Sequence, residues 1–132
     1  MPALSYSQAR AEFRAVLDEA SRGGTTTITR GDTRAAITDA TRLRTYLAAT
    51  IPPTGEVVLT DGLCTILIPD LGLSSESAVL DEAVDDMVDA LYEYADEWPQ
   101  LAHAPSHRDN WAVVQLVHLS TPAQLRDWLL GT

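Results

Sequence analysis

The fold of the first third of this 132-residue chain is decided by residues 5–47, "SYSQARAEFRAVLDEASRGGTTTITRGDTRAAITDATRLRTYL". This stretch holds seven of the nine basic residues, all of them arginine, in a protein whose formal net charge is −10. Residues 1–50 carry seven arginines against five acids, a net of +2, while residues 51–132 carry two arginines against fourteen acids, a net of −12. Two modules with opposite electrostatics are therefore expected, and the basic one suits a polyanionic partner.

The first element predicted in this stretch is an amphipathic helix. Ser5 and Gln8 fit a capping box for a helix over about residues 6–22. Its apolar positions fall on one stripe, and Arg10 and Arg14 flank that stripe one turn apart. These two arginines are therefore candidates for contact with phosphate, the alternative being ordinary solvated surface charge.

A β-hairpin is predicted next, over residues 25–38. Its arms "TTTITR" and "TRAAIT" are rich in β-branched and small residues, and the "GD" between them is typical of a turn. Arg30 and Arg34 lie near the tip and join the candidates for DNA contact. Asp39 or Thr41 is expected to cap a short second helix.

The first module is too small to be very stable as a monomer. About 50 residues bury little apolar surface, so we expect a homodimer formed through residues 1–50. With a short strand over residues 2–5, its layout is (β)αββα.

This layout resembles the N-terminal domain of Phd/YefM-type antitoxins. The similarity covers residues 2–48 and is carried by "SQARAEFRAVLDEA" followed by "TITRGDTRAAIT". The resemblance implies a homodimeric DNA-binding domain that represses its own operon, in a gene pair whose other product is a toxin. The basic positions that match are Arg10, Arg14, Arg30 and Arg34.

The second module, residues 56–132, is predicted to follow a linker at residues 51–55, "IPPTG". It opens with a hairpin, "EVVLT-DG-LCTILIP", and continues with a long helix with an acidic outer face within residues 78–98. Residues 111–119 are predicted as a third strand, and Ser120 or Thr121, followed by Pro122 and Gln124, as the start of a last helix. The expected fold is α+β, with a ββαβα antiparallel-sheet domain after the first module.

Residues 67–98, "LIPDLGLSSESAVLDEAVDDMVDALYEYADEW", resemble the partial RNase H-like domain of HicB antitoxins. The resemblance implies a domain that binds a toxin. Because toxins that attack RNA carry basic surfaces, an acidic domain is expected to steer and hold a small basic toxin. The expected toxin-binding residues are four acids and two aromatic anchors: Asp85, Asp86, Asp89, Glu93, Trp98 and Trp128. The alternative interpretation of Trp128 is that its side chain lies in the core of the domain.

The sequence also argues against catalysis and metal binding. Cys64 lies in an apolar run typical of a small buried hydrophobe, and His103 and His107 lie in "HAPSH", which we interpret as a loop. No catalytic residue, metal site or cofactor is expected. The apolar runs are too short to span a bilayer and no signal peptide opens the chain, so a cytoplasmic protein is expected. The alternative function is a small metal-dependent nuclease, which requires carboxylates that converge from several elements.

Overall fold

The computed structural model describes residues 3–53 and 55–132, and the chain divides into two compact units. The basic unit is Met1–Thr45 and the acidic unit is Tyr46–Thr132. The boundary lies inside a helix, ahead of the segment 51–55 that the sequence suggests as a linker. Residues 46–50 carry no charge, so the two units keep the net charges of +2 and −12.

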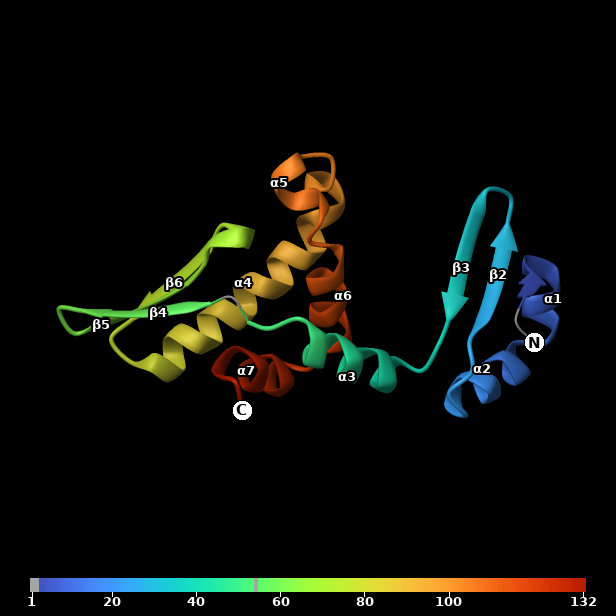
Figure 1. Cartoon of the computed structure of the whole chain (residues 1–132), viewed down its shortest axis with the longest axis horizontal. Helices are drawn as coiled ribbons and strands as arrows, with labels where there is room; N and C mark the ends of the chain where they lie inside the picture. Colours follow the sequence, from blue (N-terminus) through green and yellow to red (C-terminus); the bar gives the residue numbers. More distant parts are fainter. Residues whose placement is uncertain (1–2, 54) are drawn as a thin grey trace. The chain divides into compact units, whose positions relative to one another are not determined.

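The basic unit is a three-stranded sheet with helices that begin and end at local signals (Figure 1). Its elements, in chain order, are β1 (Ala3–Ser5), α1 (Tyr6–Ala11), α2 (Phe13–Ser21), β2 (Thr26–Arg30), β3 (Thr33–Ile37) and α3 (Ala40–Thr50), the last of which runs into the acidic unit. The sheet order is β1-β2-β3, with β1 parallel to β2 and β2 antiparallel to β3.

The expected capping box at the start of α1 is confirmed. The Ser5 hydroxyl accepts a hydrogen bond from the Gln8 backbone N–H at 3.2 Å, and the Gln8 side chain accepts one from the Ser5 N–H at 2.9 Å. The single helix expected over residues 6–22 is interrupted at Glu12, whose φ of −118° and ψ of 25° leave the helical range. Gly23, with φ of +93°, follows the end of α2 in the left-handed conformation that glycine adopts readily.

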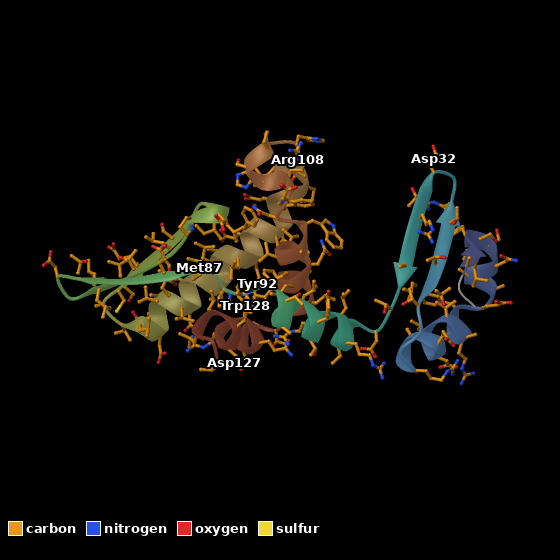
Figure 2. The ribbon with its side chains drawn as sticks, in the orientation of Figure 1. Asp32, Met87, Tyr92, Arg108, Asp127 and Trp128 are labelled. Carbon is orange, nitrogen blue, oxygen red and sulfur yellow. The ribbon has the colours of Figure 1, made fainter. Side chains whose placement is uncertain are left out.

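The hairpin expected at residues 25–38 is confirmed as β2 and β3. Figure 2 places Asp32 at its tip. Asp39 caps α3, since its carboxylate accepts a hydrogen bond from the Arg42 N–H at 2.9 Å. The sheet buries few side chains, of which Thr26 is 1% exposed.

The acidic unit packs helices against a second three-stranded sheet (Figure 1). Its elements are β4 (Glu56–Thr60), β5 (Leu63–Ile68), the 3-10 turn η1 (Pro69–Leu71), β6 (Leu73–Ser77), α4 (Leu80–Leu101), α5 (Pro105–Arg108), α6 (Trp111–Leu119) and α7 (Pro122–Leu130). The sheet is antiparallel, in the order β4-β5-β6. At the expected β4–β5 turn, Asp61 and Gly62 have φ of 53° and 78°, the left-handed values that this tight turn requires.

Helix α4 supplies the centre of the acidic unit's core. The apolar period predicted from the sequence is confirmed, because Val84, Met87 and Leu91 are fully buried. The acids of the same helix lie on its exposed face. Helices α6 and α7 pack beside α4.

The strand predicted at residues 111–119 is wrong, because this segment is helix α6. Its run "WAVVQLVHL" is apolar on nearly all sides, and Val114, Leu116 and Val117 are buried. A buried helix and a buried strand share that unbroken apolar pattern, so periodicity does not separate them. The third strand of the sheet is β6, in the serine-rich stretch before α4, where no strand was predicted.

The loop expected at "HAPSH" is also corrected, since Pro105–Arg108 form the short helix α5 with Pro105 in its first turn. The helix start expected at Ser120 or Thr121 is confirmed at Thr121, which forms a capping box with Gln124 through hydrogen bonds of 2.9 and 3.2 Å. Within the described part of the chain, no helix is long and apolar enough to cross a membrane.

Candidate functional site

The clearest basic cluster of the molecule surrounds one tyrosine of the basic unit. The guanidinium carbons of Arg10 and Arg30 lie 5.7 and 5.5 Å from the centroid of the Tyr6 ring. Both distances fit a cation–π contact, which holds the two cations together despite their repulsion. Arg10 lies on α1 and Arg30 at the end of β2, so the fold joins two of the expected DNA-binding residues.

The other two expected DNA-binding residues are exposed but lie apart from this cluster. Arg14 lies in α2, beyond the interruption at Glu12. Arg34 lies opposite Thr29 in the β2–β3 register, whereas Arg30 lies opposite Thr33. Because alternate residues point to opposite faces of a sheet, Arg34 and Arg30 lie on different faces of the hairpin.

Two arginines of the basic unit are engaged in local contacts. Arg22 forms a salt bridge with Glu19 at 2.7 Å, and its hydrogen bond and charge hold the pKa of Glu19 below the ordinary value. Arg42 pairs with Asp39 at 3.2 Å and donates a hydrogen bond to the Ser21 carbonyl at 3.1 Å. Both arginines place positive charge at the C-terminal end of α2, where it is favourable.

An exposed apolar stripe runs along the helices of the basic unit. Tyr6 on α1 and Phe13 and Leu17 on α2 are 43%, 49% and 50% exposed. Phe13 and Leu17 are four residues apart and so lie on one face of α2. Tyr6 and Phe13 also line a surface groove of about 320 Å³ with Ala9, Arg10 and Ile28. An apolar face of this kind is typical of an interface with another chain.

The four acids expected to bind a toxin lie on α4, but they differ in their partners. Arg126 of α7 forms salt bridges with Asp85 and Asp81, the latter at 3.2 Å, and so ties α7 to α4. Asp86, Asp89 and Glu93 are exposed, and no salt bridge engages them within residues 3–53 and 55–132. Spacings of three and four place these three acids in one row, named here the acidic stripe.

The two expected aromatic anchors are held inside the acidic unit. Trp128 is 8% exposed, and its indole N–H donates a hydrogen bond to the Ile51 carbonyl at 2.8 Å. Trp98 is half-buried and donates to the His107 carbonyl at 2.8 Å. Trp111, in contrast, is 56% exposed.

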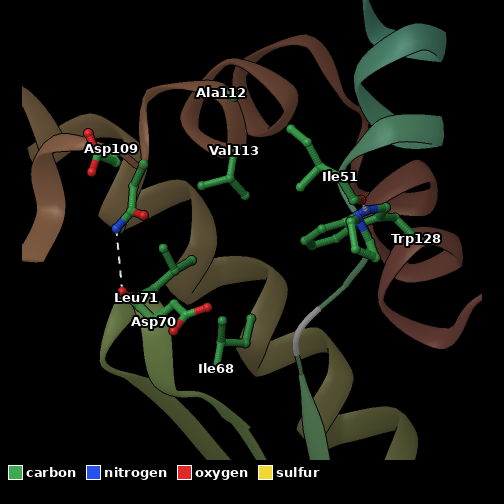
Figure 3. Close-up of a pocket in the computed structure, with 10 residues that line it drawn as sticks. Ile51, Ile68, Asp70, Leu71, Asp109, Ala112, Val113 and Trp128 are labelled. Atoms are coloured by element: carbon green, nitrogen blue, oxygen red, sulfur yellow. Dashed lines mark hydrogen bonds between the residues drawn. The ribbon is translucent and has the colours of Figure 1, made fainter.

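A pocket of about 240 Å³ lies beside Trp128. Figure 3 shows Trp128 and Ile51 on one side of it and Asp70, Leu71 and Asp109 on the other. The pocket is smaller than the cavities of roughly 300–1,000 Å³ that bind small molecules, so it suits at most one or two side chains.

A polar network next to this pocket has no counterpart in the sequence-based predictions. The Tyr94 hydroxyl lies 2.8 Å from Nδ1 of His107 and accepts a hydrogen bond from the Asn110 amide at 2.9 Å. Asn110 also donates to the Asp70 carbonyl at 3.4 Å, and Figure 3 marks this contact. The network ties α5 to α4, and the sequence signal for it is weak because its members are far apart in the chain.

Carboxylates do not converge in the part of the chain that is described. Within residues 3–53 and 55–132, no three His, Cys, Asp or Glu side chains are grouped so as to hold a metal ion. The acids of the acidic unit lie mostly along α4, and the others are distributed over separate elements and turns.

Comparison with solved structures identifies a neighbour for the whole fold. The chain is similar to a crystal structure described as the antitoxin part of a proposed toxin/antitoxin system from Syntrophomonas wolfei subsp. wolfei. The TM-score is 0.78, and the match covers 97% of this chain and 96% of that one at 16% sequence identity. No protein-family model and no curated protein matches the chain. At this identity the two proteins share a mixed α+β fold, while the Phd/YefM and HicB resemblances stay predictions.

Proposed function

We propose that this protein is the antitoxin of a type II toxin–antitoxin pair, which neutralises a small basic toxin through its acidic unit and binds operator DNA through its basic unit. The observation that carries the proposal is the division of charge, +2 in one unit and −12 in the other. A polyanion is attracted by the first and repelled by the second, while a cationic protein is attracted by the second. The fold shared with an antitoxin supports the same role.

Arg10, Arg14 and Arg30 are the proposed phosphate contacts. All three are exposed, and the Tyr6 ring orders two of them. Arg34 reaches the same duplex only around the other face of the hairpin. DNA contact by phosphate neutralisation gives affinity that falls with salt, roughly one unit of log–log slope for each phosphate bound.

A gel-shift salt series on promoter DNA of the operon tests this assignment. Replacing Arg10 and Arg30 with glutamine should weaken binding to all sequences and reduce the slope by up to about two. The matched control is Arg22→Gln together with Arg42→Gln, which removes two cations that already have carboxylate partners. An equal loss of slope in both variants would show that net charge alone matters.

Homodimerisation through residues 1–50 is proposed to use the stripe of Tyr6, Phe13 and Leu17. Pairing of two such stripes removes apolar area from water, which is the main source of stability for a small dimer. Leu17→Glu should therefore convert the dimer to monomer in light scattering after gel filtration. The exposed Leu130, outside this unit, is the matched site for Leu130→Glu, which should leave the mass unchanged.

We assign toxin binding to the acidic stripe of Asp86, Asp89 and Glu93. Asp85 adds negative charge beside the stripe, although it also forms a salt bridge with Arg126. Exposed charges of this kind mostly raise the association rate. Trp98 and Trp128 support the surface from within, because their hydrogen bonds fix α5 and α7. Stopped-flow association with the protein of the adjacent short reading frame should slow at high salt. Replacing Asp86 and Asp89 with asparagine and Glu93 with glutamine should remove most of this dependence of the association rate on salt.

The nuclease alternative is less well supported. A metal-dependent nuclease requires carboxylates that converge on one or two ions, and the described residues hold no such group. No observation favours a second function over the antitoxin.

A further inference from the structure

Strand β4 is an open, apolar edge of the acidic unit's sheet. It pairs with β5 on one side, and within residues 3–53 and 55–132 no strand pairs with its other side. All five of its residues, Glu56–Thr60, are exposed. Its N–H and C=O groups on the open side are therefore available to another strand.

Helix α4 covers the rest of the sheet but leaves β4 uncovered. The side chains that face α4 include Ile66 and Ile68, which are 3% and 2% exposed, and Ser75, which donates a hydrogen bond to the Ala83 carbonyl of α4. In the β4–β5 register, Val57 lies opposite Ile66 and so shares this face. Val57 is nevertheless 53% exposed.

Leu59 extends the same uncovered face. It lies opposite Cys64 in the register and is 73% exposed, the highest value among the large apolar side chains of residues 3–53 and 55–132. Val57 and Leu59 thus form an apolar shelf on the inner face of the sheet, beside α4. Such a shelf next to an open edge is a strong site for strand addition.

The usual protection of edge strands is missing from β4. Natural edges carry lysine, proline, a bulge or an inward-pointing charge that blocks pairing. The sequence of β4, "EVVLT", has neither lysine nor proline, and its one charge, Glu56, lies at the end on the outer face. The lack of protection indicates that this edge has a partner.

We propose that β4 pairs antiparallel with β4 of a second copy of this chain, in a register centred on Val58. This register is two-fold symmetric and places Glu56 opposite Thr60 at both ends, so no like charges meet. It also places Val57 opposite Leu59 on the inner face, where the two shelves lie side by side and pack as cross-strand neighbours.

The composition of the edge favours a second copy over the basic toxin. A cationic partner is attracted by acids, and the acidic stripe of Asp86, Asp89 and Glu93 belongs to α4, whereas Glu56 is the one acid of β4. The β4 edge is instead self-complementary in both charge and hydrophobicity. Because five residues bury less than a standard interface, the contact is expected to be weak in free solution and stronger once the chains are held together. The inference rests on the β4 edge, and it requires neither the toxin nor the apolar stripe of Tyr6, Phe13 and Leu17.

Disulfide trapping in the full-length chain tests the register. In a Cys64→Ser background, Val58→Cys places two thiols directly opposite one another, with Cα atoms roughly 4.5–5.5 Å apart, which is within disulfide range. Glu56→Cys and Thr60→Cys are the matched controls, because each residue and its symmetry mate are about four residues, or roughly 13 Å, apart along the strands. Under mild oxidation we expect about tenfold more linked dimer from Val58→Cys than from either control.

A second pair of variants tests the shelf. Adding Leu59→Lys to the Val58→Cys chain puts a cation on the shelf and should reduce trapping several-fold. Leu63→Lys changes an exposed residue on the outer face and should leave trapping unchanged. Equal trapping at positions 56, 58 and 60, or no trapping at position 58 in a chain whose circular dichroism is native, would overturn the proposal. Trapping at position 58 only when the toxin is present, as a mixed disulfide with it, would also overturn it in favour of a toxin strand.

Discussion

Trp128 donates a hydrogen bond of 2.8 Å to the carbonyl oxygen of Ile51, so the last helix holds the segment that enters the acidic unit. The contact joins residues 77 positions apart. It explains why Ile51 belongs to a packed unit although "IPPTG" has the composition of a linker.

Trp128→Phe should therefore destabilise the acidic unit. The change leaves the Ile51 carbonyl without its donor, which costs about 1–3 kcal/mol in the free energy of unfolding. Urea denaturation followed by far-ultraviolet circular dichroism measures the loss. Trp111→Phe, at a side chain 56% exposed, is the control and should stay within about 0.5 kcal/mol of the parent. Equal effects at the two sites would contradict the structural role of the Trp128 bond.

Thr26→Val should stabilise the basic unit. The Thr26 side chain is 1% exposed, and its hydroxyl has no hydrogen-bond partner within residues 3–53 and 55–132. Replacing a buried, unpaired hydroxyl by a methyl group of similar size removes a desolvation penalty of about 1–3 kcal/mol. Native-state hydrogen exchange at the Ile28 amide would report the gain, and Thr29→Val, on the exposed face of β2, should give little change.

Acid should weaken the end of α2. The Arg22 hydrogen bond and charge lower the pKa of Glu19, so this carboxylate contributes stability that is fully present above its unfolded pKa of about 4.3. The contribution is lost as the pH falls through the lower, folded pKa. Thermal melts of the parent and of Arg22→Gln should thus converge at low pH and separate near neutrality. A constant difference across the pH range would contradict this role of the pair.

Asp89→Lys should stabilise the acidic unit and weaken toxin binding at once. Asp89 has Asp86 three residues before it and Glu93 four residues after it, and such like-charge pairs each cost about 0.2–0.5 kcal/mol in a helix. All three tryptophans lie in the acidic unit, so their fluorescence follows its unfolding. The control, Asp85→Lys, makes the same charge change on the same helix but breaks the contact with Arg126 and should destabilise. Equal changes in stability for Asp89→Lys and Asp85→Lys would contradict the conclusion that Asp85 is paired and Asp89 is not.

Local signals predicted much of the fold. Both capping boxes, at Ser5 and Thr121, and both hairpin turns lie within four consecutive residues, so nearest-neighbour chemistry settles them. The acidic helix was predictable because its apolar period runs for 22 residues.

The misassigned elements depend on tertiary contacts. Residues 111–119 are apolar enough for either a strand or a buried helix, and packing beside α4 selects the helix. Strand β6, "LSSES", has a weak strand signal, and it is fixed by pairing with β5 and by the hydrogen bond from Ser75 to the Ala83 carbonyl. Neither contact can be read from a local window of sequence.

The sequence predicted which residues the candidate sites contain, but it did not predict which of those residues lie together. Charge counting placed the arginines in one unit and the acids in the other. No local pattern indicates that Tyr6 joins Arg10 to Arg30, or that Arg126 binds Asp85 and removes it from the set of unpaired acids. The contact between Tyr6 and Arg30 joins residues 24 positions apart in the sequence, and the contact between Arg126 and Asp85 joins residues 41 positions apart.

Growth rescue tests the antitoxin role most directly. Cells that express the adjacent short reading frame should stop growing, and the full-length chain should restore growth. Asp86→Lys, Asp89→Lys and Glu93→Lys together should abolish rescue, whereas Glu12→Lys, Asp18→Lys and Asp32→Lys, which change the net charge equally from the basic unit, should preserve it. Failure of the parent chain to rescue, or full rescue by the variant of the acidic stripe, would contradict neutralisation of a basic toxin by this surface.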